Sequence, residues 1–91
     1  MTSIKIYTQD IKRNKLLKLV SRYFKNFTMY KTTGYWQGLP EKSLMFEIVP
    51  DTLFNYHEPV KRLCHDIKIM NCQESVLVVE IKTETQEVSF L

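Results

Sequence analysis

Residues 4–24, IKIYTQDIKRNKLLKLVSRYF, switch from one apolar periodicity to another, and this switch decides the fold class. The first four of them alternate apolar and polar side chains, as a half-buried strand does. Asp10 is a typical N-cap residue, and after it apolar side chains recur at spacings of three and four through Leu16, Val20 and Phe24. The stretch therefore predicts a strand that leads directly into an amphipathic helix over residues 11–24.

The rest of the chain repeats this order with one additional strand. Residues 27–33 are rich in β-branched and aromatic side chains, and residues 43–49 alternate again. Between them, residues 34–42 (GYWQGLPEK) hold both glycines and a proline, which indicates a turn or a long hairpin tip. Pro59 suits the first turn of a second helix that ends near Asn71.

Residues 75–82 (SVLVVEIK) form the strongest strand pattern, and residues 88–91 leave room for a short extra one. The resulting order is strand, helix, strand, strand, helix, strand, which is typical of the ferredoxin-like split βαβ fold. We expect a single α+β domain over residues 1–91, with an antiparallel four-stranded sheet and both helices on one face.

The overall composition is that of an ordinary globular domain. The chain has 91 residues, of which 44% are hydrophobic and 25% charged, and this length accommodates one core. No apolar run approaches the roughly 20 residues that span a bilayer, and the N-terminal residues lack the apolar region of a secretory signal. We therefore expect a cytoplasmic protein without membrane contact. The absence of alanine indicates AT-rich coding, as in many phages and plasmids.

One face of the expected sheet has no helix to cover it. The side chains that we place on this second face are Tyr7, Tyr30, Met45, Val49 and Val78. Aromatic and branched side chains exposed on a single-layer sheet favour an oligomer interface. We expect a homodimer that forms through this face.

The charge of +3 is unevenly distributed. Residues 11–40 hold seven basic residues and no acid, whereas residues 41–91 hold nine acids and five bases. Four of the basic residues share one stripe of the first helix, opposite its apolar face: Lys15, Lys18, Arg22 and Lys25. This basic stripe favours a phosphate backbone or an acidic protein as partner, and the alternative is a solvated helix face.

The sequence offers no recognisable catalytic or metal-binding constellation. Cys64 and Cys72 lack the close spacing of a structural zinc hook, so we assign no metal, no cofactor and no catalytic residue. Cys64 is the single candidate for a thiol nucleophile, but the adjacent His65 would point about 100° away on a helix.

The segment 33–43 differs from the rest of the chain because it holds the only tryptophan, both glycines and a nearby acid. Tyrosine and tryptophan are favoured anchors in binding hot spots. Our candidate partner-binding residues are Tyr35, Trp36, Gln37 and Glu41. The alternative is that Trp36 folds back and completes the small core, and the sequence leaves both possibilities open.

Residues 10–24, DIKRNKLLKLVSRYF, which follow a strand ending at Tyr7, resemble the start of a small CRISPR-associated family of ferredoxin-like dimers. The likeness covers about a quarter of the chain and implies the fold. The metal-binding aspartate of that family has no counterpart, because residues 7–9 read Tyr-Thr-Gln, so nuclease activity is not implied. The PII-like and CutA-like signalling proteins share the order of elements without a matching motif.

These observations predict a small non-enzymatic binding or regulatory protein that acts as a homodimer and recognises a protein partner. One concrete form is a phage- or plasmid-encoded modulator or inhibitor of a host defence protein. The first alternative is a nucleic-acid-binding module that uses the basic stripe, and the second is a small nuclease-like or hydrolytic enzyme.

Overall fold

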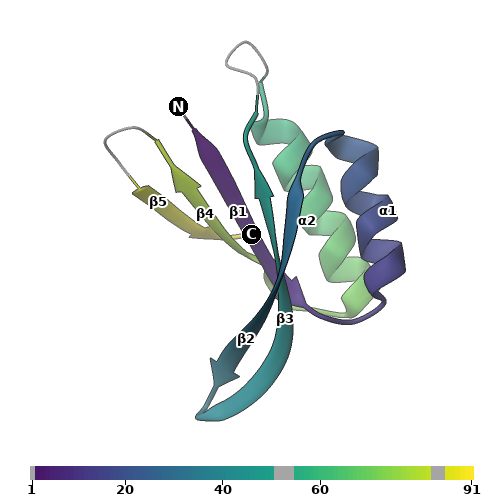
Figure 1. The fold of residues 1–91 in the computed structure, drawn as a ribbon, viewed down its shortest axis with the longest axis vertical. Helices are drawn as coiled ribbons and strands as arrows, with labels where there is room; N and C mark the ends of the chain where they lie inside the picture. Colours follow the sequence, from purple (N-terminus) through teal and green to yellow (C-terminus); the bar gives the residue numbers. More distant parts are fainter. Residues whose placement is uncertain (1, 51–54, 83–85) are drawn as a thin grey trace.

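The computed structural model describes residues 2–50, 55–82 and 86–91. Within them the chain forms β1 (Ser3–Gln9), α1 (Arg13–Tyr23), β2 (Thr28–Trp36), β3 (Leu39–Ile48), α2 (His57–Asn71), β4 (Leu77–Ile81) and β5 (Gln86–Phe90). The strands make one antiparallel sheet in the order β2-β3-β1-β4-β5, and both helices cover the same face (Figure 1). The ferredoxin-like prediction is confirmed, with five strands rather than four because β5 pairs along β4.

The start of α1 differs from the prediction. The helix begins at Arg13, and its N-cap is Lys12, which has a left-handed backbone with φ 55°. Asp10 instead accepts a hydrogen bond from the guanidinium of Arg13 at 2.5 Å, and this bond lowers the pKa of the Asp10 carboxyl. The prediction of Asp10 as the N-cap is therefore wrong, because its carboxylate is paired with a side chain rather than with backbone amides of the first turn.

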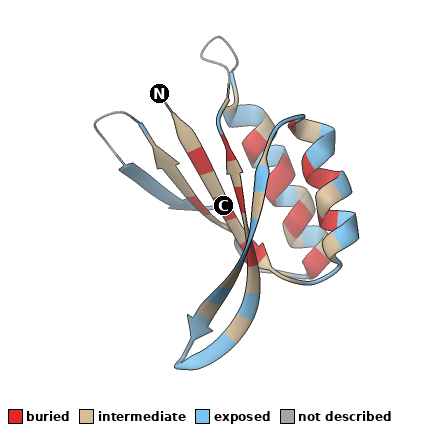
Figure 2. Ribbon diagram, viewed as in Figure 1, coloured by how far each residue is buried: buried red, intermediate tan, exposed pale blue. Residues whose placement is uncertain are grey.

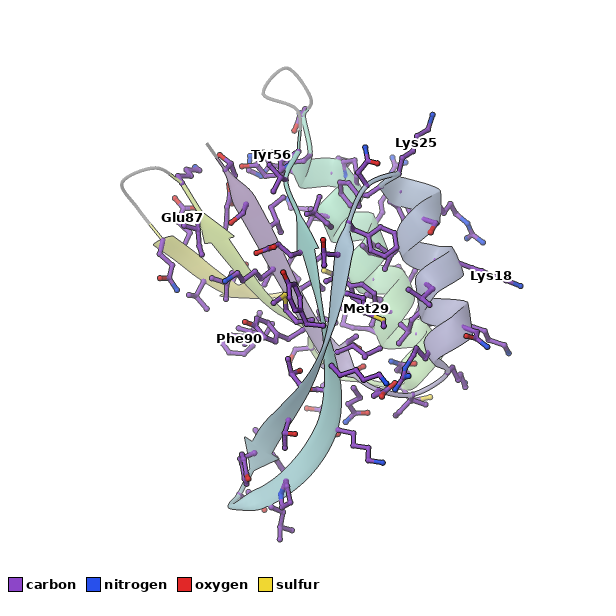
Figure 3. All side chains as sticks on the ribbon, viewed as in Figure 1. Lys18, Lys25, Met29, Tyr56, Glu87 and Phe90 are labelled. Carbon is purple, nitrogen blue, oxygen red and sulfur yellow. The ribbon has the colours of Figure 1, made fainter. Side chains whose placement is uncertain are left out.

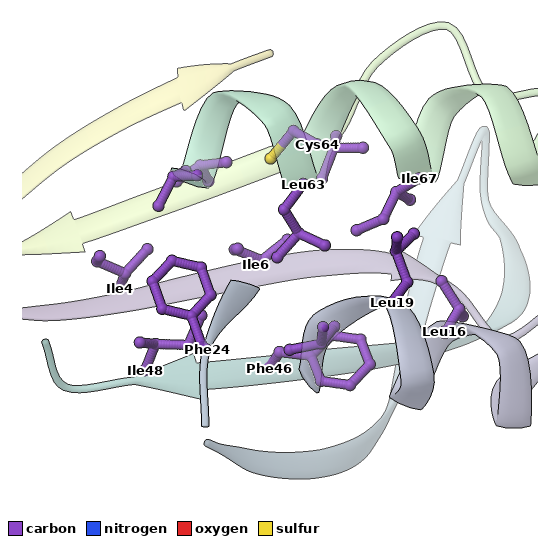
Figure 4. Close-up of a cluster of buried hydrophobic side chains, with 14 of the residues drawn as sticks. Ile4, Ile6, Leu16, Leu19, Phe24, Phe46, Ile48, Leu63, Cys64 and Ile67 are labelled. Atoms are coloured by element: carbon purple, nitrogen blue, oxygen red, sulfur yellow. The ribbon is translucent and has the colours of Figure 1, made fainter. Parts of the chain in front are cut away.

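The core lies between the sheet and the two helices, where both layers contribute apolar side chains (Figures 2 and 4). The predicted positions Leu16 and Val20 are buried along α1, and Phe24 is buried directly after its end. The ring of Phe46 is fully buried and meets that of Phe27 edge-on, with centroids 5.8 Å apart. The other buried apolar residues are Ile4, Ile6, Leu19, Leu44, Ile48, Val60, Leu63, Cys64, Ile67, Val76 and Val78.

The face of the sheet opposite the helices, here called the open face, carries many apolar side chains. The register of the strands places on it Tyr7, Tyr30, Met45, Leu77, Val79, Val88 and Phe90, together with the charged Lys5 and Glu47. Val78 does not belong to this face, because its pairing with Ile6 turns it toward the helices, where it is 5% exposed. Val49 lies beyond the end of β3. The prediction of an uncovered face is thus correct for Tyr7, Tyr30 and Met45 and wrong for Val78.

The β2–β3 hairpin extends beyond the other strands (Figure 1). β1 ends where Gln9 faces Ser43, whereas β2 and β3 remain paired as far as Trp36 and Leu39. Gln37 and Gly38 have φ values of 50° and 79°, as a two-residue hairpin turn requires. The glycine-containing segment is therefore mainly paired strand, and its projection creates a concave corner beside the end of β1.

Candidate functional site

A hollow of about 410 Å³ lies where the hairpin leaves the sheet. Its size falls within the range of small-molecule sites, about 300–1,000 Å³. We call it the hairpin pocket, and its lining residues come from all five strands and from the connection between α2 and β4: Tyr7, Thr8, Gln9, Gly34, Tyr35, Trp36, Glu41, Ser43, Gln73, Ser75, Leu77 and Phe90.

Three of the four predicted partner-binding residues meet at this pocket. Tyr35, Trp36 and Glu41 line it, while Gln37 lies in the hairpin turn. Trp36 is 70% exposed, so the alternative in which it completes the core is wrong. The pocket thus combines a partly buried carboxylate with exposed aromatic rings, a combination that attracts cations.

Gly34 leaves the carboxylate side of the pocket open. Gly34 is the residue of β2 that pairs with Glu41 of β3, so the cross-strand neighbour of Glu41 on β2 has no side chain. A Cβ atom added at Gly34 would meet Ser43 Oγ at 3.8 Å and the backbone oxygen of Glu41 at 4.0 Å, which are ordinary contacts. The missing side chain therefore contributes space to the pocket, whereas backbone geometry does not require glycine here.

A hydrogen-bonded triad of polar side chains forms the wall on the other side, and sequence reasoning missed it. The Thr8 hydroxyl donates to Gln73 Oε1 at 2.6 Å, and Asn71 Nδ2 donates to both Thr8 Oγ1 (3.2 Å) and Gln73 Oε1 (3.0 Å). Gln73 is placed by Cys72, which ends α2 in a left-handed conformation with φ 54°. Among the described residues, Asn71 Oδ1 is the single buried side-chain polar atom without a hydrogen-bond partner.

The basic stripe lies elsewhere, on the helical layer. Lys15, Lys18 and Arg22 line a separate hollow of about 390 Å³ between α1 and α2, together with the exposed Ile69. Lys25 lies past the end of α1, and both Lys18 and Lys25 project outward from the helical layer (Figure 3). The two predicted interaction surfaces are therefore distinct.

The candidate thiol nucleophile is inaccessible. Cys64 is 0% exposed within the core, and this burial raises the pKa of its thiol to about 12. A thiolate is the reactive form of cysteine, so burial disfavours nucleophilic chemistry at this position. His65, its neighbour in sequence, is exposed on the solvent side of α2.

A third hollow, of about 220 Å³, lies at the opposite end of β1 beside the first turn of α2. There the Tyr56 hydroxyl donates a hydrogen bond to Glu80 Oε1. Burial and, next, this hydrogen bond raise the pKa of Tyr56 to about 12. Glu80 Oε1 is also 3.8 Å from Lys82 Nζ, so this carboxylate oxygen has two partners within the same chain.

No protein-family model matches the chain, and no curated protein matches its sequence. Comparison with solved structures instead places it in a structural class, the ferredoxin-like α+β proteins that include small phage enzymes and PII-like regulators. In this class it is similar to a phage S-adenosylmethionine lyase in complex with S-methyl-5′-thioadenosine, with a TM-score of 0.78 and 15% identity. The match covers 99% of this chain and 88% of that one.

Two further solved structures agree with this placement. The apo state of a phage S-adenosylmethionine lyase matches with a TM-score of 0.76 and 16% identity, over 99% of this chain and 87% of that one. CPII, a nitrogen regulatory PII-like protein from Thiomonas intermedia K12 bound to ADP, AMP and bicarbonate, matches with a TM-score of 0.57 and 15% identity over 99% and 90%. Identities this low establish the shared fold. The neighbours are compatible with a small phage-related or regulatory protein.

The described residues contain no helix that is both long and apolar enough to cross a membrane.

Proposed function

We propose that this protein binds S-adenosylmethionine in the hairpin pocket and cleaves it to S-methyl-5′-thioadenosine. The observation that carries this proposal is the partly buried Glu41, set among aromatic side chains and opposite the bare Gly34. The fold supports it, because the phage lyase matches this chain over 99% of its length. The bound adenosine derivatives of both the lyase and CPII also favour an adenosine-containing ligand.

The layout of the pocket fits the chemistry of this substrate. S-adenosylmethionine carries a positive sulfonium and ammonium at one end and a neutral purine at the other. Glu41, Tyr35 and Trp36 lie on the hairpin side and attract the cationic end, since carboxylates and aromatic faces both stabilise cations. Leu77 and Phe90, paired on β4 and β5, offer an apolar surface to the purine. β3 and β4 are separated by β1, so the two sides lie roughly 10 Å apart in the sheet.

The reaction requires no second substrate. The bond from sulfur to the four-carbon amino acid chain breaks, and its electron pair stays on sulfur, which becomes a neutral thioether. The four-carbon fragment can be released in one of two ways. Either its own carboxylate oxygen bonds to the carbon attached to sulfur as the bond to sulfur breaks, or a proton passes from the adjacent carbon to the solvent as a double bond forms and the bond to sulfur breaks. Both routes balance, and the four-carbon product identifies the route.

The direct test is incubation of the purified protein with S-adenosylmethionine and detection of S-methyl-5′-thioadenosine by mass spectrometry. We expect product formation that Glu41→Gln reduces at least about fivefold at a low concentration of S-adenosylmethionine. Glu58→Gln is the matched control, because Glu58 is exposed on α2 and its ion pair with Arg62 Nε, at 3.8 Å, is also exposed. Absence of both cleavage and binding, with the fold intact by circular dichroism, would refute the proposal.

We further propose that the protein assembles from copies of itself through the open face. Val88 is 55% exposed on this face, and a lysine there would place a charge in the interface. Ile69→Lys is the control, since Ile69 is comparably exposed, at 66%, on the helical side. Light scattering should show a multimer for the unmodified chain and for Ile69→Lys, and a smaller mass for Val88→Lys. A monomeric unmodified chain would contradict this part of the proposal.

A protein partner at the hairpin tip is the second candidate function. Tyr35, Trp36 and Leu39 are 70–72% exposed there, as hot-spot anchors are before binding. A phage- or plasmid-encoded modulator or inhibitor of a host defence protein would use this tip. On this hypothesis Tyr35→Ala and Trp36→Ala keep the fold and lose the partner. The unmodified protein and Glu41→Gln then behave alike toward adenosine ligands, because neither binds them. Capture of a partner together with no affinity for S-adenosylmethionine would favour this candidate.

A further inference from the structure

The polar triad of Thr8, Asn71 and Gln73 joins residues that are far apart in the sequence. Thr8 and Gln73 are 65 positions apart, yet the distance between Thr8 Oγ1 and Gln73 Oε1 is 2.6 Å. Thr8 is 3% exposed and Asn71 is 8% exposed, so both anchor the triad from the core side. Gln73 lines the hairpin pocket and is therefore the member best placed to meet a ligand.

The hydrogen bonds determine which end of the Gln73 amide is free. Gln73 Oε1 accepts from both Thr8 Oγ1 and Asn71 Nδ2, so both of its lone pairs are occupied. Rotating this amide by 180° would set Gln73 Nε2 against Asn71 Nδ2, two groups that only donate. Rotating both amides would instead set Gln73 Oε1 against the backbone oxygen of Ser75, two groups that only accept, and would move Asn71 Nδ2 to the position where Asn71 Oδ1 has no partner. The orientation is therefore fixed by the triad.

In this orientation Gln73 Nε2 has one N–H to spare. One of its two hydrogens reaches the backbone oxygen of Ser75 over a long 3.3 Å. The remaining N–H has no acceptor among the described residues, and the Leu77 and Phe90 side chains of the same pocket carry none. A ligand that fits here has a flat apolar ring with a hydrogen-bond acceptor at the edge of that ring.

We infer that Gln73 recognises the purine of the ligand by donating this N–H to a ring nitrogen of adenine. Thr8 and Asn71 are positioning residues that hold the amide in place. The inference rests on the proposed function and adds to it, since it assigns the purine to the side of the pocket that Gln73 and Phe90 line. A ring nitrogen is the partner because Gln73 Oε1 is occupied and cannot accept from the exocyclic amine.

The test is isothermal titration calorimetry with S-methyl-5′-thioadenosine, which carries the purine and lacks the positive charge. Gln73→Met removes the donor at similar volume, and we expect about five- to tenfold weaker binding, as for the loss of one hydrogen bond. Thr8→Val frees the amide and should weaken binding about threefold. Gln86→Met is the matched control, because Gln86 is exposed on β5 and does not line the pocket, and it should change binding less than twofold.

A second readout separates recognition from a structural role. The 1-deaza, 3-deaza and 7-deaza analogues each replace one ring nitrogen by a C–H group. We expect one analogue to bind the unmodified protein about five- to tenfold more weakly than the parent and to bind Gln73→Met as well as the parent does.

The outcomes of these titrations are distinguishable. Tight binding of S-methyl-5′-thioadenosine with no discrimination among the analogues would overturn the role of Gln73 and leave the proposed function standing. The same holds if Gln73→Met keeps the discrimination of the unmodified protein. No binding of any adenosine derivative by the unmodified protein would overturn both.

Discussion

Replacing Glu41 by glutamine tests the charge of the hairpin pocket with almost no change in shape. Glu41 is partly buried at an open hollow, so the effective dielectric there lies between that of a protein surface and that of water. At about 5 Å, a carboxylate and a sulfonium attract each other by ~1 kcal/mol at a dielectric of ~80 and by ~3 kcal/mol at ~20. Glu41→Gln should therefore weaken binding of S-adenosylmethionine by about five- to 150-fold.

The neutral product provides the internal reference for this prediction. S-methyl-5′-thioadenosine lacks the sulfonium and the ammonium, so Glu41→Gln should change its affinity by less than about twofold. Calorimetric titration of both ligands into the unmodified chain and the variant measures the difference directly. An equal loss for both ligands would show that Glu41 acts through the shape or stability of the hairpin. An unchanged affinity for both would show that Glu41 does not face the ligand, and either result would refute the electrostatic argument.

Three further perturbations address separate parts of the molecule. Gly34→Val should change the melting temperature by no more than a few degrees, because a Cβ at this position meets only ordinary contacts and valine favours strands. The valine side chain should fill part of the pocket and lower the ligand affinity measured by calorimetry at least tenfold. The free energy of unfolding should fall between pH 10 and pH 12, because the unfolded chain ionises its tyrosines near 10 while folded Tyr56 retains its proton up to about 12. Denaturant titrations should show a shallower fall for Tyr56→Phe, and an identical slope would contradict the contribution of Tyr56. If the basic stripe binds nucleic acid, fluorescence anisotropy should detect an affinity that falls steeply with salt concentration. The double variant Lys18→Glu with Arg22→Glu should abolish this binding. Binding that is absent or independent of salt would show that the stripe is a solvated helix face.

Most of the fold follows from local patterns in the sequence. The apolar spacing in α1 and the alternation in β1 and β3 arise from which side chains face one core, so each element reports its own periodicity. The N-cap was not predictable, because Asp10 has a competing partner, Arg13, three residues away. The orientation of Val78 was not predictable either, since a shift of one residue in register exchanges the two faces of a strand.

The candidate site likewise has one half that could be predicted from the sequence and one half that could not. The hairpin half was predictable because Trp36, Gly34 and Glu41 occur within a few positions of a composition found nowhere else in the chain. The half around Gln73 was not, because its function depends on contacts with Thr8 that only the folded topology creates. Cys72, whose left-handed backbone directs the chain toward Gln73, carries no sequence signal for that conformation, which glycine or asparagine would usually adopt.

The pocket and the open face share residues, and this determines which substitutions can separate their roles. Tyr7, Leu77 and Phe90 line the pocket and also belong to the open face, so changing any of them would alter ligand binding and assembly together. Val88 lies on the same face but does not line the pocket. A Val88→Lys protein that loses mass and keeps its affinity for S-methyl-5′-thioadenosine would show that one copy of the chain forms a complete binding site. Parallel loss of mass and affinity, with the fold retained, would show that ligand binding depends on the assembled form.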